Sequence, residues 1–141
     1  MHLHLRGENI PEALCEALAA ITDNARLNPT GVAFDDISGS VQFPIERYPL
    51  IRQRRVRSNL HDWSNPIQST LTVRRVVSCR IEDITTSGPE EPIHLLFGVR
   101  VRDDEIYLCS AEEDRGSTCF SVTIDITGVD IELNDDPRSS E

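Results

Sequence analysis

The sequence predicts an α+β fold in which one N-terminal amphipathic helix packs on a mostly antiparallel meander sheet of about 5–7 strands. Two observations predict it. A single apolar stripe at helical spacing lies near the N-terminus, and apolar residues alternate with polar ones along several later segments. The length of 141 residues suits one domain with an ordinary core. We therefore expect a single α+β domain over residues 1–133 and a disordered polar tail over residues 134–141.

The helix is expected over residues 10–27. Asn9 followed by Glu12 is a variant of the capping box at its start, and the Asn28-Pro29 dipeptide is expected to end it. The apolar residues recur at spacings of three and four, which places them on one face: Ile10, Leu14, Ala17, Leu18, Ile21 and Ala25. Such a face must cover another element, and the segments that follow have the pattern of strands.

Alternating apolar residues predict the strands. Leu3 and Leu5 indicate a short first strand, and residues 40–45 indicate an edge strand because Pro44 has no amide hydrogen. A turn is expected at residues 36–39 and a loop at residues 58–69. Five strands are expected after that, with these apolar residues: Leu71, Val73, Val77, Cys79 and Ile81; Ile93, Leu95, Phe97, Val99 and Val101; Ile106 and Leu108; Phe120, Val122, Ile124 and Ile126; Val129, Ile131 and Leu133.

Short turns are expected to join these strands into a continuous meander, since each hairpin then pairs apolar residues with apolar residues. Residues 71–81 are expected to pair with residues 93–101. The other expected pairs are Val101 with Ile106, Val99 with Leu108, Leu108 with Phe120, Ile126 with Val129, Ile124 with Ile131 and Val122 with Leu133. Cys109 and Cys119 would then lie opposite each other, where a disulfide is conceivable, although two thiols remain the default in a reducing compartment.

Composition excludes several chemistries. All 14 basic side chains are Arg, so the chain has no lysine for a Schiff base or a P-loop. The four cysteines lack the spacing of zinc ligands, and the His2-x-His4 pair lacks a fixed third ligand. No catalytic or cofactor signature is present. We therefore assign no catalytic residue, no metal ligand and no cofactor.

Charge is distributed very unevenly along the chain. The formal net charge is −10, yet residues 47–81 hold eight Arg against one acid and residues 82–141 hold four Arg against sixteen acids. Strand parity places basic side chains on one side of the outer sheet face and acidic ones on the other. The basic side chains need anionic partners, which could come from acidic loops of the same chain, from a second subunit or from a ligand. Parity also turns Arg75 inward, for which a bulge or a strand end is the favoured explanation.

The candidate binding residues follow from this charge pattern. Guanidinium groups suit carboxylates and phosphates, but aromatic residues for base stacking are nearly absent, which argues against nucleic-acid binding. The candidates are Arg52, Arg54, Arg55, Arg57, Arg74, Arg80 and Arg100.

These features favour a non-enzymatic protein-interaction module that uses a charge-divided sheet face and an Arg-rich segment, with a protein partner or self-association. One alternative is an acidic, immunity-like antagonist of a basic protein, which would use Glu112, Glu113 and Asp114. Another is a small enzyme with a pocket near residues 58–69, where His61 and Asp62 could form an orienting pair. Because no leader and no long apolar run are evident, we expect a cytoplasmic protein that does not bind membranes.

Overall fold

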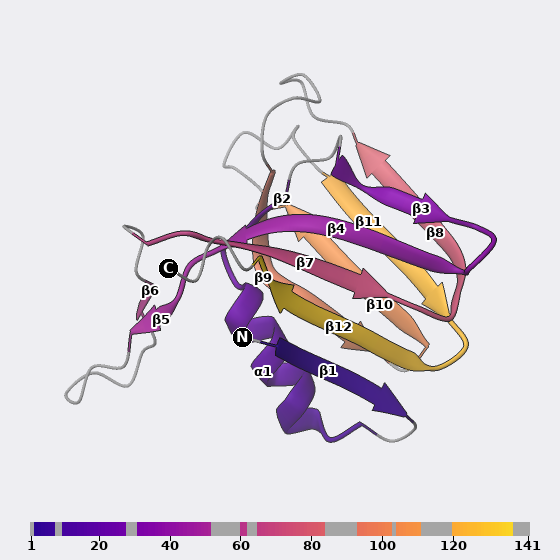
Figure 1. Cartoon of the computed structure of the whole chain (residues 1–141), viewed down its shortest axis with the longest axis horizontal. Coiled ribbons are helices and arrows are strands. Elements are labelled where there is room, and N and C mark those ends of the chain that lie inside the picture. Colours follow the sequence, from indigo (N-terminus) through magenta and orange to yellow (C-terminus); the bar gives the residue numbers. More distant parts are fainter. Residues whose placement is uncertain are drawn as a thin grey trace.

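The computed structural model shows a mostly antiparallel β-sheet with one helix, a mixed α+β fold dominated by the sheet (Figure 1). The structure describes residues 2–7, 10–27, 31–51, 60–61, 65–83, 93–102, 104–110 and 120–136. The elements are β1 (His2–Gly7), α1 (Glu12–Thr22), β2 (Arg26–Leu27), β3 (Ala33–Asp35), β4 (Ser40–Arg47), β5 (Leu50–Ile51), β6 (Leu60–His61), β7 (Ile67–Val73), β8 (Val76–Asp83), β9 (Ile93–Arg102), β10 (Glu105–Ser110), β11 (Phe120–Ile126) and β12 (Val129–Asp135).

The main sheet has ten strands within the described residues, which is more than we expected from the sequence. Its order is β1-β12-β7-β4-β2-β9-β10-β11-β8, with β3 on β4, and β5 and β6 form a separate two-stranded sheet. The sheet folds over at β2, which pairs with both β4 and β9. In Figure 1, β9, β10, β11 and β8 form a second layer behind β1, β12, β7 and β4.

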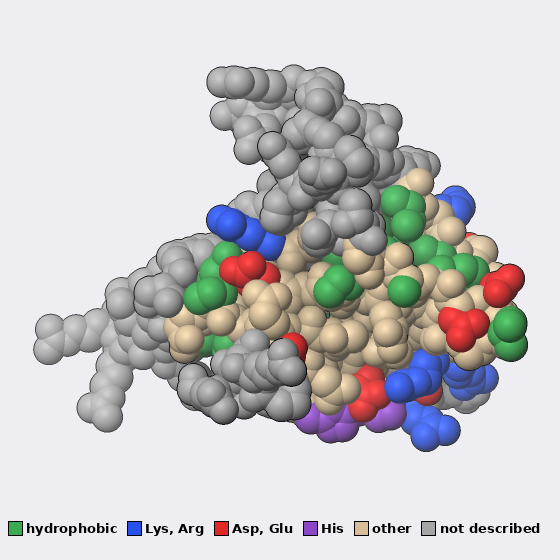
Figure 2. All heavy atoms as spheres, turned by 45° about the horizontal axis from the view of Figure 1, so that its top comes forward, with side chains coloured by type: hydrophobic (Ala, Val, Ile, Leu, Met, Phe, Trp, Pro, Cys, Tyr) green, Lys and Arg blue, Asp and Glu red, His purple; other side chains and the backbone are tan. Residues whose placement is uncertain are grey.

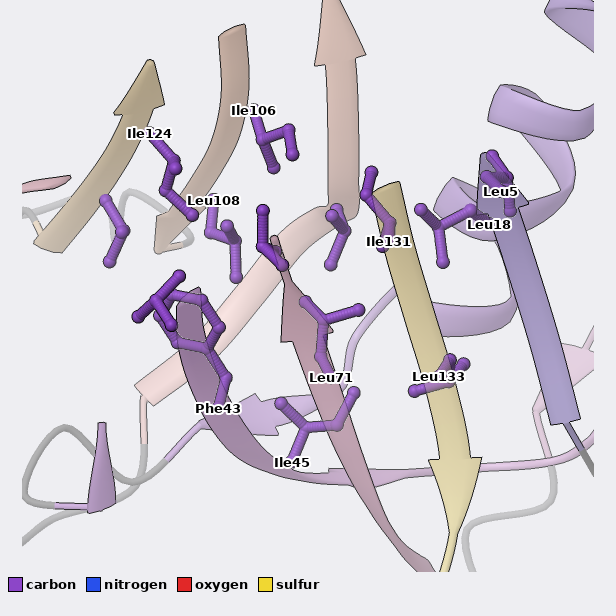
Figure 3. Packing of buried hydrophobic residues seen from close by; sticks show 14 of the residues in the cluster. Leu5, Leu18, Phe43, Ile45, Leu71, Ile106, Leu108, Ile124, Ile131 and Leu133 are labelled. Atoms are coloured by element: carbon purple, nitrogen blue, oxygen red, sulfur yellow. The ribbon is translucent and has the colours of Figure 1, made fainter. Parts of the chain in front are cut away.

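The hydrophobic core lies between these two layers. Figure 3 shows Ile106, Leu108 and Ile124 of the second layer on one side, and Phe43 and Leu71 of the first layer on the other. All five side chains are buried. Each buried side chain of this size contributes roughly 1.5–3 kcal/mol, so the alternation along these strands is the main source of stability.

Helix α1 is shorter than the expected 10–27. It ends at Thr22 because Asn24 adopts a left-handed backbone conformation, with φ of 61°, two residues later. The buried face also differs from the expected stripe, since Leu14 is 42% exposed whereas Leu18 and Thr22 are fully buried. Cys15, which lies off the expected stripe, packs against the core.

The helix is locked onto β9 by one buried hydroxyl group. Thr22 Oγ1 donates to the carbonyl oxygen of Leu18 at 2.7 Å and accepts the N–H of Val99 at 2.8 Å. The neighbouring Gly98 has a φ of 67°, and a Cβ there would lie 2.4 Å from the carbonyl oxygen of Ala19. Glycine at position 98 therefore allows the helix to approach the strand this closely.

Several local predictions are confirmed. Strand β1 forms where expected, residues 36–39 form a turn that Asp35 Oδ1 stabilises, and β9 and β10 pair in the expected register, Val101 with Ile106 and Val99 with Leu108. The edge position of β4 is wrong, because β7 lies on one side of it and β3 and β2 lie on the other. Pro44 lies between the residues that pair with β3 and those that pair with β2, where its missing N–H is tolerated.

The continuous meander is wrong at two connections. Strands β11 and β12 are joined by a tight turn but do not pair with each other: β11 pairs with β8 and β10, and β12 pairs with β1 and β7. Residues 71–81 form two strands rather than one, and neither of them pairs with β9. The chain crosses from one layer to the other at two corners, one between β7 and β8 and one between β11 and β12. Strands β7 and β12 are therefore neighbours in one layer, and β8 and β11 are neighbours in the other.

Arg75 lies at one of these corners. Its φ is 59°, its side chain is exposed rather than turned inward, and its carbonyl oxygen accepts the N–H of Thr127 from the other corner at 3.0 Å. A bulge or a strand end was expected at Arg74-Arg75. In the structure β7 ends there, and the chain crosses to the other layer before β8 begins. The bulge lies one step further, where Ser78 pairs with Asp125 and Val76 pairs with Ile126.

The pairing of β10 with β11 is confirmed, but its register is wrong by two residues. Leu108 lies opposite Val122 rather than Phe120, and Cys109 lies opposite Ser121. The direct opposition of Cys109 and Cys119 is therefore not found, and position 119 lies outside the described residues.

A buried ion pair joins the end of β12 to β4, inside the segment expected to be a tail. Arg47 donates through Nη2 to Asp135 Oδ2 at 2.7 Å and through Nε to Asp135 Oδ1 at 3.0 Å, and Ser69 Oγ donates to the same Oδ1 at 2.7 Å. The side chains of Arg47 and Asp135 are only 8% and 7% exposed. Strand β12 thus continues to Asp135, and residues 137–141 lie outside the described residues.

Candidate interaction surface

The structure describes three of the seven expected arginines. Arg52, Arg54, Arg55 and Arg57 lie outside the described residues, between β5 and β6. The other three lie on different elements: Arg74 follows β7, Arg80 is on β8 and Arg100 is on β9.

Arg74 is part of an ionic cluster with the acids of β12. Its guanidinium lies 2.8 Å from Glu132 Oε1 and 3.4 Å from Asp130 Oδ1. The histidines of β1 contact the same acids, His2 at 2.6 Å from Glu132 and His4 at 2.7 Å from Asp130. The basic and acidic side chains are therefore interleaved on neighbouring strands, and the anionic partner of Arg74 comes from its own chain.

This cluster shifts the acid–base properties of its members. Hydrogen bonds from Arg74 and His2 lower the pKa of Glu132 to about 2, and the same contact with Glu132 raises the pKa of Arg74. Glu132 thus stays ionised at any physiological pH. A ligand that recruited Arg74 would have to break these contacts.

Arg80 is much less engaged. Its side chain is 62% exposed, and its ion pair with Asp125 is long, at 3.9 Å. Asp125 meanwhile accepts a short hydrogen bond of 2.6 Å from Ser78 and remains 42% exposed. Such exposed pairs contribute little to stability, so Arg80 can turn to another anion at little cost.

Arg100 lies beside a small cleft of about 170 Å³ between α1 and β9. The helix side of this cleft carries Glu12, Cys15 and Glu16. Burial and the charge of Glu12 raise the pKa of the Cys15 thiol, so the thiol stays protonated and is a weak nucleophile. The enzyme alternative had centred elsewhere, on His61 and Asp62. Asp62 and the His61 side chain lie outside the described residues, as do Glu112, Glu113 and Asp114 of the antagonist alternative.

An exposed apolar patch was missed by the sequence analysis. Val77 and Ile81 of β8, expected in the core, are 64% and 49% exposed, and Phe34 of β3 and Ile37 of the turn after it are also exposed. We call these four residues the edge patch. The N–H of Val76 donates to the carbonyl oxygen of Gly39, which ties β8 to the turn after β3. Figure 2 shows hydrophobic side chains on the surface on this side of the molecule.

The edge patch was missed for a physical reason. Alternation shows that a strand has an apolar face, but it does not show whether the strand lies inside the sheet or at its end. Strand β8 is the last strand in the order, so only β11 flanks it among the described strands. Its apolar face is consequently only half covered.

The described residues contain no group of three or more His, Cys, Asp or Glu side chains able to hold a metal ion. Helix α1, the one helix in this part of the chain, is too short to cross a membrane. Comparison of the chain with protein-family models, with curated proteins and with solved structures finds no match.

Proposed function

We propose that this chain is a non-enzymatic protein-interaction module whose contact surface is the edge patch together with Arg80. The observation that carries this proposal is the exposure of Val77 and Ile81 on a strand at the end of the sheet. The open edge of a strand offers backbone N–H and C=O groups to another chain, and natural proteins usually protect such edges with charged residues. Strand β8 combines exposed apolar side chains with an edge that no other described strand pairs with.

The opposite end of the strand order shows the contrast. Strand β1 is also flanked by one strand among those described, but it carries His2, His4 and Arg6 on its exposed side. These side chains contact the acids of β12. A charged edge of this kind resists pairing with another chain, so β8 is the better contact strand of the two.

Arg80 adds specificity to this surface. It lies on β8 between the apolar positions, with its side chain on the opposite face of the strand, and its ion pair with Asp125 is long at 3.9 Å. A partner with a carboxylate near this point would gain a charge-assisted hydrogen bond. The arginines of residues 52–57 remain in the proposal as a second contact region, supported by their charge alone.

Binding of a partner to charged variants of the edge patch tests the proposal. Partners would be captured from an extract of the source organism, and each would then be purified and its affinity measured by calorimetry. We expect Ile81→Asp to weaken binding at least tenfold, because it places a charge on the apolar contact. Leu14→Asp is the matched control, since Leu14 is similarly exposed but lies on α1. Equal affinities for the wild type and Ile81→Asp would overturn the proposal.

A further inference from the structure

The open edge of β8 fits the same edge of a second copy of this chain. We propose that two copies associate by antiparallel pairing of their β8 strands around a twofold axis at Cys79. This inference rests on the proposed function, because it names the partner that the edge patch binds. It follows from the direction of the backbone groups, the order of side chains along β8 and the charges beside it.

The backbone direction can be followed from β11. The N–H of Ile126 donates to the carbonyl oxygen of Asp104, on the side of β10. Peptide groups alternate in direction along a strand, so those of Asp125 point the other way, toward Ser78 on β8. By the same alternation, the N–H and C=O groups of Cys79 point to the open edge. Two copies of β8 can therefore exchange hydrogen bonds at this residue.

The side chains match when the axis passes through Cys79. Antiparallel pairing then places Val77 of one copy opposite Ile81 of the other, and this contact occurs twice. Both side chains are largely exposed in the single chain. Their contact removes the most exposed apolar surface of β8 from water, which favours association at roughly 25 cal/mol for each Å² buried.

The charges match in the same register. Arg80 of one copy lies opposite Ser78 of the other, and the hydroxyl of Ser78 is bonded to Asp125. Each exposed guanidinium thus faces the bonded Ser78 and Asp125 side chains of the other copy, with the exposed carboxylate on β11, one strand beyond the hydroxyl. If the axis moved by one residue to Arg80, the two arginines would face each other, which is unfavourable in a sheet.

Sedimentation of the purified full chain tests the pairing. We expect a concentration-dependent dimer, and Ile81→Asp should weaken the dimer at least tenfold. Arg80→Glu should also weaken it, and adding Asp125→Arg to the same chain should restore it, because the charges across the interface are then exchanged. Leu14→Asp serves as the control that leaves association unchanged.

Oxidation tests the register. In a chain with Cys15→Ser, Cys109→Ser and Cys119→Ser, mild oxidation should link two copies through Cys79. The same chain with Cys79→Ser should give no crosslink. The proposed pairing of β8 strands would be overturned by a dimer that gives no crosslink and whose dissociation constant is unchanged by Ile81→Asp.

The two proposals fail in different ways. A chain that remains monomeric up to roughly 1 mM, but binds another protein through the edge patch, overturns self-pairing and leaves the proposed function standing. If the chain is a monomer and Ile81→Asp leaves its affinity for every partner unchanged, both proposals are overturned.

Discussion

Replacement of Asp135 by Asn tests whether the end of β12 is part of the folded core. The carboxylate of Asp135 accepts two hydrogen bonds from Arg47 and one from Ser69, and it is nearly inaccessible to water. Asn has nearly the same shape but carries no charge. The variant therefore leaves the buried guanidinium of Arg47 without its counter-ion.

The magnitude follows from burial and from the pKa. Removal of one partner of a buried ion pair costs about 3–5 kcal/mol, so we expect Asp135→Asn to lower the free energy of unfolding by about 3 kcal/mol at pH 7. Burial alone would raise the pKa of Asp135, but the hydrogen bonds to its carboxylate, of which that from Arg47 has the largest effect, outweigh burial and lower the pKa from 3.8 to about 2. That difference corresponds to about 2 kcal/mol of stability.

The sign of the pH dependence is defined by this shift. Because the pKa is lower in the folded state, ionised Asp135 stabilises the fold at pH values above about 4. This contribution is lost as the pH falls from about 4 through about 2. The difference in free energy of unfolding between the wild type and Asp135→Asn should therefore decrease by about 2 kcal/mol across this range.

Urea unfolding at pH 7 and at several lower pH values measures both effects. The matched control is Asp125→Asn, because Asp125 also accepts a hydrogen bond from a serine but is 42% exposed. We expect Asp125→Asn to lower the free energy of unfolding by less than about 1 kcal/mol. The reasoning is refuted if Asp135→Asn is as stable as Asp125→Asn at pH 7, or if its stability runs parallel to that of the wild type at low pH.

Two further predictions concern other contacts. Gly98→Ala should destabilise the fold by at least about 2 kcal/mol more than Gly7→Ala, as measured by thermal unfolding, because both glycines have a positive φ but a Cβ meets α1 only at position 98. Arg74→Gln should raise the pKa of Glu132 from about 2 toward its ordinary value, whereas Arg80→Gln should leave it unchanged; carboxyl NMR titration would show this, and an unmoved Glu132 pKa in Arg74→Gln would contradict the assigned contact.

Local interactions explain which predictions succeeded. The register of β9 and β10 follows from a two-residue turn and from apolar pairs close in sequence, Val101 with Ile106 above all. The turn at residues 36–39 follows from the Asp35 side chain, which bonds to backbone groups two and three residues ahead. Such contacts lie within a few residues, so their signals can be read without the rest of the chain.

Predictions of strand pairing were wrong where the two paired strands are far apart in the sequence. A tight turn between β11 and β12 resembles a hairpin in sequence, but β12 pairs with β7 because both strands lie in the other layer. The candidate surface changed for this reason as well. Arg74 contacts Glu132 across paired strands, so its anionic partner lies in its own chain, whereas Val77 lies on the last strand of the sheet order and is exposed.

The amino-acid sequence alone determined the class of the fold, the position of the first strand, the presence of a helix near the N-terminus and the apolar face of most strands, because alternation and helical spacing are properties of neighbouring residues. Only the tertiary structure decided which strands are neighbours, which one lies at the open edge and which charges are already paired. These depend on contacts between residues far apart in the chain, such as Arg47 with Asp135, and no local pattern specifies them.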